Sequence, residues 1–250
     1  MYLEQGGEGP DLLLMLHGMG ATGAVWSPMC ASADARWGGR WVVMDLPGHG
    51  QSVRQDSYAI GQYAASVARA VLPHVDPSGR LVVLGHSLGG VIALALATGW
   101  FGVAPHRVFG AGIKLAWSDD ELRRVETLAS QPAKRFSTEE EACDRYLKVS
   151  GLAGIADAAA PVIARGVRRE TDGWCLAMDP RANGVGKPPM SELAALARCP
   201  VHLGRGRDDA LVTMAQTRAL DPGASDLGPH GHNGMVEAPE RIWDWVASYD

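Results

Sequence analysis

Cysteine is scarce in this 250-residue sequence, and its four copies, Cys30, Cys143, Cys175 and Cys199, are far apart. None of them forms a CxxC pair or stands at the spacing of zinc ligands, which argues against a zinc-binding module. A chain of this length can bury enough apolar surface to fold without disulfides. We therefore expect four free thiols, a reducing compartment and a cytoplasmic location.

Long apolar runs and an excess of positive charge are also missing. The longest apolar helical run, at 91–98, is too short to cross a bilayer, and residues 1–11 resemble no signal peptide. Lys and Arg number 23 against 28 Asp and Glu, a formal charge of −5. Such a chain is a poor partner for nucleic acid or an anionic membrane. The expected partner is a small molecule, and the oligomeric state stays open.

Short apolar runs alternate with helical stretches. The runs predict strands at 1–5, 11–16, 40–45, 80–85, 107–113, 199–206 and 224–228. Helices are expected at 58–72, from residue 88, after 208 and from 239. Continuous apolar strands separated by helices are typical of a parallel sheet covered on both faces. We predict an α/β fold with a mostly parallel central sheet of about seven strands.

The alternation stops after Ile113, and about seventy residues follow with helical periodicity but no convincing strand. Ser and Thr caps predict helices at 118–130 and 137–151, another helix is expected near 158–170, and 180–189 reads as a loop. We predict a core domain made of 1–113 and 188–250, with a helical lid at 114–187.

One serine stands at the corner between an apolar strand and an apolar helix. It is Ser87, in the sequence Gly85-His86-Ser87-Leu88-Gly89, which fits the pattern GxSxG. A nucleophile on such a sharp turn needs a strained backbone, so the residues two positions away on either side must be small. The helix behind it directs unpaired amides and the positive end of its dipole at the reacting atom.

A serine hydroxyl is inert until a base takes its proton. Two downstream segments follow predicted strands, at the sheet edge where open α/β folds bind ligands. One of them offers Asp208 and Asp209, and the other offers His230 and His232. Position alone leaves both pairs open.

Five motifs in this order resemble those of α/β-hydrolase-fold serine hydrolases of the esterase-like kind. They are HGMG at 17–20, DLPGHGQS at 45–52, GHSLGG at 85–90, GRDDALV at 206–212 and GHNGMVEAP at 231–239. The resemblance covers nearly the whole chain except the lid, which would follow the strand that the family counts as its sixth. Such chains usually have two strands before the HG motif. Here there is room for one, which reduces the sheet from eight strands to seven.

The resemblance implies a catalytic triad with Ser87 as nucleophile, Asp209 as acid and His232 as base. It also implies an oxyanion hole made of the backbone N–H groups of Met19 and Leu88. The implied enzyme is a carboxylesterase-like hydrolase, which cleaves a small ester-type acyl substrate through an acyl-enzyme, with no metal and no organic cofactor.

Two side chains are expected to contact the substrate. Trp117 stands at the entrance to the lid, and Met235 flanks the expected acyl site.

Other functions remain as alternatives. Lactonases, thioesterases and carbon–carbon-bond hydrolases share this fold, although the last group tends to carry Asn at the position of His86. A non-catalytic receptor on the same fold is an alternative of another class. His230 and His232 also form a possible metal pair, but no third ligand stands near them in the sequence.

A dinucleotide-binding oxidoreductase is a further alternative. Gly18 to Gly23 fits GxGxxG, and Asp45 follows 22 residues after Gly23. The expected helix after the glycines is interrupted by Pro28, which disfavours this hypothesis. It predicts stabilisation by NAD or NADP.

Overall fold

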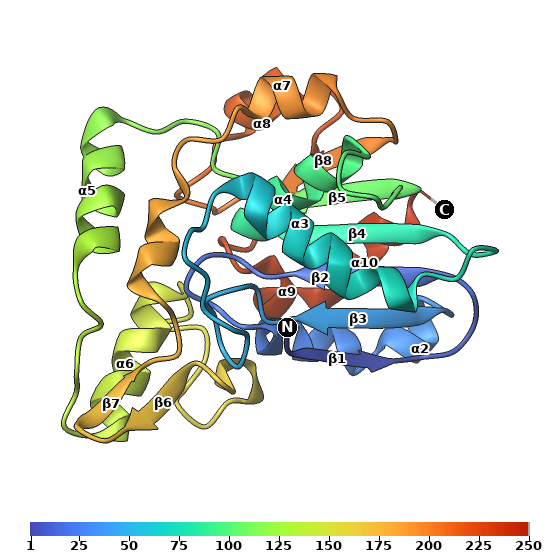
Figure 1. The fold of residues 1–250 in the computed structure, drawn as a ribbon. Helices are drawn as coiled ribbons and strands as arrows, with labels where there is room; N and C mark the ends of the chain where they lie inside the picture. The colour runs from blue at the N-terminus through green and yellow to red at the C-terminus, as the bar shows by residue number, and fades with distance from the viewer. Residues whose placement is uncertain (250) are drawn as a thin grey trace.

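The computed structural model describes residues 1–249, whose fold is drawn in Figure 1. The strands are β1 (Leu3–Gly6), β2 (Leu12–Leu16), β3 (Arg40–Met44), β4 (Leu81–His86), β5 (Arg107–Ala111), β6 (Val167–Glu170), β7 (Gly173–Leu176), β8 (Val201–Arg205) and β9 (Ser225–Asp226). The α-helices are α1 (Ser27–Cys30), α2 (Ala33–Arg36), α3 (Ile60–Val71), α4 (Leu88–Ala97), α5 (Asp119–Ser130), α6 (Glu139–Val149), α7 (Met190–Ala195), α8 (Met214–Leu220), α9 (Gly234–Glu237) and α10 (Pro239–Ala247). Short 3-10 helices are η1 (Gly23–Trp26), η2 (Leu72–His74), η3 (Pro161–Ile163) and η4 (Pro180–Val185).

Seven strands form one sheet in the order β1-β3-β2-β4-β5-β8-β9. Strand β1 runs antiparallel to β3, and all other neighbouring pairs are parallel. The expected α/β fold, with a mostly parallel sheet of about seven strands, is confirmed. Because parallel strands end at one edge, the segments after β4, β8 and β9 gather there.

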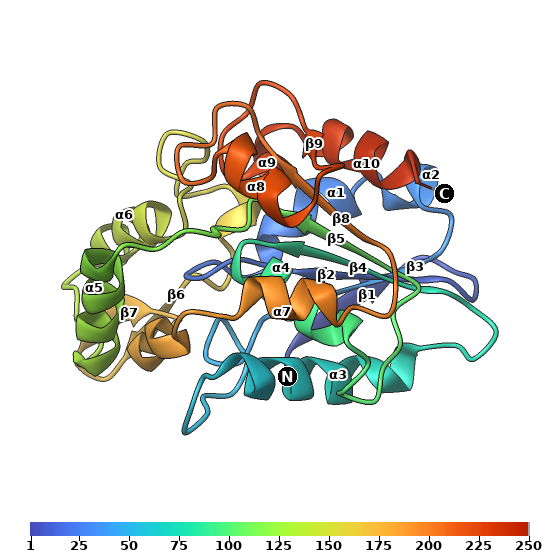
Figure 2. The same ribbon diagram turned by 90° about the horizontal axis from the view of Figure 1, so that it is seen from above.

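The central strand β2 shows why the sheet is covered on both faces. Its five residues are all buried. Leu12, Leu14 and Leu16 belong to the apolar core that also includes α3 and α4, whereas Leu13 and Met15 belong to the core that includes α1 and α10. Figure 2 shows these two layers on opposite sides of the sheet. A strand buried on both faces reads as a continuous apolar run, which is why the sequence revealed it.

The segment after β5 lies at the carboxyl ends of the parallel strands, at the left of Figure 1. Helices α5 and α6 are close to their expected bounds. The side chain of Ser118 accepts a hydrogen bond from Glu121 N at the start of α5, and that of Thr138 accepts one from Glu141 N at the start of α6. These caps explain why the sequence located both helices.

The expectation of a segment without strands is wrong at 167–176, where β6 and β7 form an antiparallel hairpin. Both strands are only four residues long. Strand β6 carries three charged residues, and β7 offers an apolar run of only three residues, Trp174 to Leu176, which is too short to predict a strand. Ion pairs from Arg168 and Arg135 to Glu170 accompany the pairing. Pairing with a partner, rather than local pattern, decides such strands.

Two further expectations in this segment are wrong. The helix near 158–170 is replaced by η3, because Arg165 has a φ of 65° and Gly166 follows it. The loop expected at 180–189 contains η4, which begins where the Asp179 side chain accepts a hydrogen bond from Arg181 N. Within residues 1–249, no helix is long and apolar enough to cross a membrane. All four cysteines are free, as expected.

Candidate active site

Ser87 lies at a strained corner between β4 and α4. Its φ of 49° and ψ of −114° are rare for a residue with a side chain. A Cβ atom added at Gly85 would lie 2.2 Å from the Gly89 carbonyl oxygen, and one added at Gly89 would lie 2.2 Å from the Leu16 carbonyl oxygen. The two glycines therefore let three pieces of backbone approach closely, and this holds the serine at the sheet edge.

The loops after β8 and β9 place a carboxylate against an imidazole. His232 Nδ1 lies 2.8 Å from Asp209 Oδ2, and the Asp209 side chain is fully buried. Asp208 is exposed, so the structure distinguishes the two neighbouring carboxylates. The His232 ring also contacts the ring of His86, next to Ser87, with 4.6 Å between centroids.

Asp208 and His230, the other acid and base candidates from the sequence, contact each other through the backbone. His230 is buried beside the Asp209 loop, where its carbonyl accepts a hydrogen bond from Asp208 N. Its ring Nδ1 lies 3.0 Å from the Gly231 carbonyl. Within residues 1–249, no group of three or more His, Cys, Asp or Glu side chains is placed to hold a metal ion.

Glu237 holds the His232 loop, a role that sequence reasoning did not assign. Its carboxylate accepts hydrogen bonds from Gly231 N at 2.8 Å and from Asn233 N at 3.0 Å, one on each side of His232. The Asn233 side chain donates to the carbonyl of Gly151 at 2.9 Å and so ties this loop to the end of α6. The signal was present in the sequence, because Glu237 belongs to the last motif.

The HG loop packs directly against Ser87. A Cβ atom added at Gly18 would lie 3.2 Å from Ser87 Cβ. Within the described chain, neither the Met19 nor the Leu88 amide donates a hydrogen bond to another residue. The two amides expected to form an oxyanion hole are thus unpaired donors on elements that adjoin Ser87.

Two buried histidines hold the HG loop against the segment after β3. His17 Nε2 accepts a hydrogen bond from Leu46 N at 2.9 Å, and His49 Nε2 accepts one from Gly20 N at 3.2 Å. Each ring can then donate from Nδ1 to a carbonyl, Gly18 for His17 and Pro47 for His49. Both rings are neutral in this arrangement.

Burial lowers the pKa of His49 to about 3 and lowers the pKa of His17 and His86 below the ordinary 6.5. As the pH falls through 6.5, these histidines bind protons in the unfolded chain but stay neutral in the folded chain. The free energy of unfolding is therefore expected to decrease between about pH 7.5 and about pH 5.5, by up to about 1.4 kcal/mol per pH unit for each buried histidine once the pH is below the unfolded pKa.

Urea unfolding across this pH range measures the effect. The His49→Gln variant should show a shallower decrease than the wild type, because it has one fewer group to protonate. A wild-type stability that is constant or rises on acidification would contradict the assignment of neutral buried rings.

Asp45 is the central residue of a second hydrogen-bond network, which also holds the HG loop in place. Its fully buried carboxylate accepts hydrogen bonds from Gly23 N at 2.8 Å and Gln51 N at 3.0 Å, and Arg165 Nε lies 3.1 Å away. Arg165 also pairs with Glu4 at 2.8 Å. The dinucleotide hypothesis assigned Asp45 to a ribose, but the carboxylate is occupied by these protein contacts. Sequence reasoning missed Arg165, since nothing local links it to residue 45.

Arg165→Gln is expected to destabilise the fold by about 3–5 kcal/mol, because it leaves the buried Asp45 charge without its cation. Arg123 is the matched control, since it pairs with Asp120 while 66% of its side chain is exposed. Arg123→Gln should cost less than about 1 kcal/mol. Chemical denaturation of both variants measures the difference, and equal costs would contradict this role of Arg165.

A pocket of about 100 Å³ opens at Ser87, and we call it the Ser87 pocket. Its lining includes Met19 and Leu88 and is otherwise largely apolar, with Trp117 among the lining side chains. Met235 does not line it. That side chain is 2% exposed and belongs to the core, where it borders a separate small cavity next to His232.

Lys114 is a cation in the wall of this pocket that sequence reasoning did not single out. Its ammonium pairs with Glu121 and lies 4.6 Å from the centroid of the Trp117 ring. The hydrogen bond from Lys114 lowers the pKa of Glu121 to about 2. The Glu121 carboxylate therefore stays ionised at neutral pH, and its ion pair with Lys114 links the start of the segment after β5 to the first turn of α5.

Comparison with known protein families gives a match over nearly the whole chain. A model described as the alpha/beta hydrolase family matches residues 13–245. The pimeloyl-[acyl-carrier protein] methyl ester esterase of Vibrio parahaemolyticus is 38% identical over 108 residues. That match spans 43% of this chain and only 37% of the length of the relative.

Solved structures resemble almost the entire chain. The E-2-(acetamidomethylene)succinate hydrolase matches with a TM-score of 0.79 at 19% identity, covering 99% of this chain and 93% of the other. The thioesterase domain from the curacin biosynthetic pathway matches with a TM-score of 0.77 at 20% identity, covering 98% and 94%. At such identities, the likeness shows the fold alone.

Proposed function

Because the chain belongs to the alpha/beta hydrolase family, we propose that it is a serine hydrolase that cleaves a small ester-type acyl substrate. The observation that carries the proposal is the 2.8 Å contact between His232 Nδ1 and the buried Asp209, beside the strained corner at Ser87. A nucleophile that a substrate can reach, an imidazole and an orienting carboxylate are the groups that acyl transfer requires.

In the proposed mechanism, Ser87 Oγ attacks the ester carbonyl carbon while His232 Nε2 takes the hydroxyl proton. Asp209 accepts the Nδ1–H hydrogen bond, which fixes the tautomer and stabilises the imidazolium. The carbonyl oxygen becomes an oxyanion, which accepts hydrogen bonds from the amides of Met19 and Leu88. His232 returns the proton to the departing alcohol. Water then attacks the acyl-enzyme by the same route and releases the acid.

The chemistry of the Ser87 pocket favours an apolar group next to the ester. Its volume of about 100 Å³ and its Leu88, Val91 and Val185 side chains suit a short aliphatic segment. We propose that Trp117 contacts this part of the substrate and that the segment 114–187 acts as the lid. Met235 is proposed only to support His232 from the core side, because it borders the cavity beside that ring.

Ester cleavage is favoured over other reactions of the same fold by the sequence relative named as a methyl ester esterase. Thioester cleavage is the second candidate, because the curacin thioesterase domain shares the fold along nearly the whole chain. Parallel assays of an oxygen ester and a thioester of the same short acid distinguish the two.

The test uses covalent labelling together with turnover. A fluorophosphonate probe is expected to modify one peptide, the one that contains Ser87, and to block release of p-nitrophenol from p-nitrophenyl butyrate. Mass spectrometry of the digested protein locates the label. A folded protein that neither reacts with the probe nor cleaves short esters or thioesters would overturn the proposal and favour a ligand-binding receptor.

A further inference from the structure

A second pocket, of about 170 Å³, lies within the segment that follows β5. The end of α5 and the chain after it, α6, the end of β7, and η4 surround it, and Figure 1 shows these elements together beside the sheet. We call it the insertion pocket. Much of its lining is apolar, including Leu128, Phe136, Leu176 and Met178. Leu128 is 41% exposed, so its side chain is accessible to a bound molecule.

The insertion pocket borders the candidate active site on two sides. Asn183, on η4, lines both this pocket and the Ser87 pocket. Its Nδ2 donates to the Pro180 carbonyl at 2.8 Å, which fixes the side chain between them. Val149 lines the insertion pocket too, and its Cγ1 would lie 2.6 Å from a Cβ added at Gly20, next to Met19 in the HG loop. A molecule bound at Ser87 therefore has a neighbouring compartment one side chain away.

The charges of the insertion pocket have one sign. Lys134 and Arg145 line it, and no Asp or Glu does. Both cations are exposed, and neither forms an ion pair with another residue of the described chain, 1–249. Lys134 Nζ lies 5.1 Å from the centroid of the Phe136 ring, at the apolar wall. Apolar walls next to two unpaired cations are complementary to an aliphatic chain that ends in an anion.

We propose that the insertion pocket is a second substrate subsite, which binds the far end of an acyl chain that carries a terminal carboxylate. The reacting carbonyl of the same molecule lies at Ser87, and the chain passes Asn183. The substrate class is thus a half-ester of a linear dicarboxylic acid. This inference rests on the proposed serine hydrolase function and goes beyond it by stating what the distal group is.

The test compares two esters that differ only at the far end. They are mono-p-nitrophenyl octanedioate and p-nitrophenyl octanoate, and the series is extended to six and ten carbons to find the length that reaches the cations. We expect kcat/KM of the wild type to favour the carboxylate-ended ester about tenfold at the best length, which corresponds to one charge-assisted hydrogen bond. In the double variant Lys134→Gln, Arg145→Gln, that preference should disappear.

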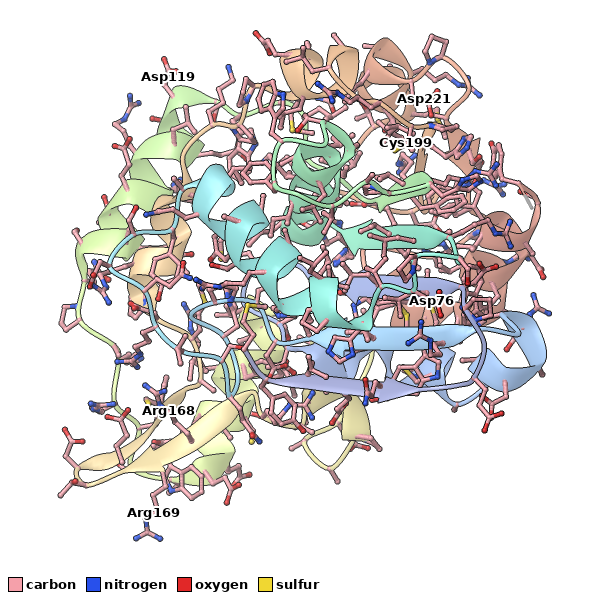
Figure 3. The ribbon with its side chains drawn as sticks, turned by 45° about the vertical axis from the view of Figure 1, so that its right-hand side comes forward. Asp76, Asp119, Arg168, Arg169, Cys199 and Asp221 are labelled. Carbon is pink, nitrogen blue, oxygen red and sulfur yellow. The ribbon has the colours of Figure 1, made fainter. Side chains whose placement is uncertain are left out.

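Arg169→Gln provides the matched control. Arg169 is an exposed arginine on β6 of the same segment, does not line the insertion pocket and points away from the body of the molecule (Figure 3). Its replacement removes a positive charge from the same segment but not from the pocket lining. It should therefore leave the preference for the carboxylate-ended ester unchanged. The preference is the ratio of kcat/KM for the carboxylate-ended ester to kcat/KM for the ester without the carboxylate. A wild-type ratio of one or less at every chain length would overturn the proposal, and so would an unchanged ratio in the double variant.

Calorimetric binding separates this inference from the proposed function. Octanedioate should bind the wild-type protein more tightly than octanoate does, and the double variant should lose that difference. If no ester is cleaved but this pattern is found, the hydrolase proposal fails and the carboxylate subsite stands. If esters are cleaved and the two acids bind equally, the subsite fails and the hydrolase proposal stands.

Discussion

Ser87→Ala is expected to lower kcat for p-nitrophenyl butyrate by about 10⁶-fold, to the rate of spontaneous hydrolysis in practice. The alanine variant has no nucleophile, so it forms no acyl-enzyme, and His232 has no hydroxyl to deprotonate. The corner itself should persist, because Gly85 and Gly89 rather than the Ser87 hydroxyl allow the close backbone approaches, and alanine carries the same Cβ at a φ of 49°. Initial rates and a thermal melt measure both properties.

Ser78→Ala is a suitable control for this substitution. Ser78 is exposed in the turn before β4, where its hydroxyl contacts Asp76 at 2.7 Å. Its loss should leave kcat unchanged. If the folded Ser87→Ala variant keeps a substantial part of the wild-type rate, the nucleophile is another group, and the role proposed for the corner is wrong.

Asp209→Asn is expected to lower kcat by about 10⁴-fold with little change in KM. The asparagine amide can donate a hydrogen bond toward His232 Nδ1, which places the proton of the neutral ring on Nε2 and removes the base that faces the serine. Asp209 is fully buried and does not line the Ser87 pocket, so the effect should fall on kcat. Steady-state kinetics over the neutral pH range gives the two parameters separately.

Asp208, the neighbouring carboxylate, provides a control with the same substitution. Asp208→Asn changes the same chemical group at an exposed position. It should alter kcat less than about twofold, as surface substitutions generally have small effects. Equal losses in the two variants would mean that the 2.8 Å contact between His232 and Asp209 does not determine the rate.

Local pattern was sufficient for much of the fold. The strand β2 is buried on both faces, so its apolar run is continuous and visible. Helices α5 and α6 begin directly after Ser118 and Thr138, whose side chains cap them by accepting hydrogen bonds from the amides three residues further on. The corner at Ser87 was predicted for the same reason, since its steric demand falls on Gly85 and Gly89, close in sequence.

Local pattern did not predict the pairing of polar strands or the ion pairs between residues far apart in the sequence. The hairpin of β6 and β7 is held by cross-strand hydrogen bonds, and the charged residues of β6, two of which form an ion pair within that strand, show no apolar period. Arg165 compensates the buried Asp45 from 120 residues away in the sequence. Nothing local to these side chains specifies their partners.

The sequence by itself determined the α/β class, the corner at Ser87 and a short set of acid and base candidates, because each depends on neighbours along the chain. Position along the chain did not distinguish Asp208 from Asp209, and the contact with His232 in the tertiary structure does. Only the tertiary structure places Met235 in the core and makes Asn183 a wall shared by two pockets. These depend on which side chains the sheet edge and the segment after β5 bring together. Burial and distance are properties of the folded chain, and no short window of residues contains them.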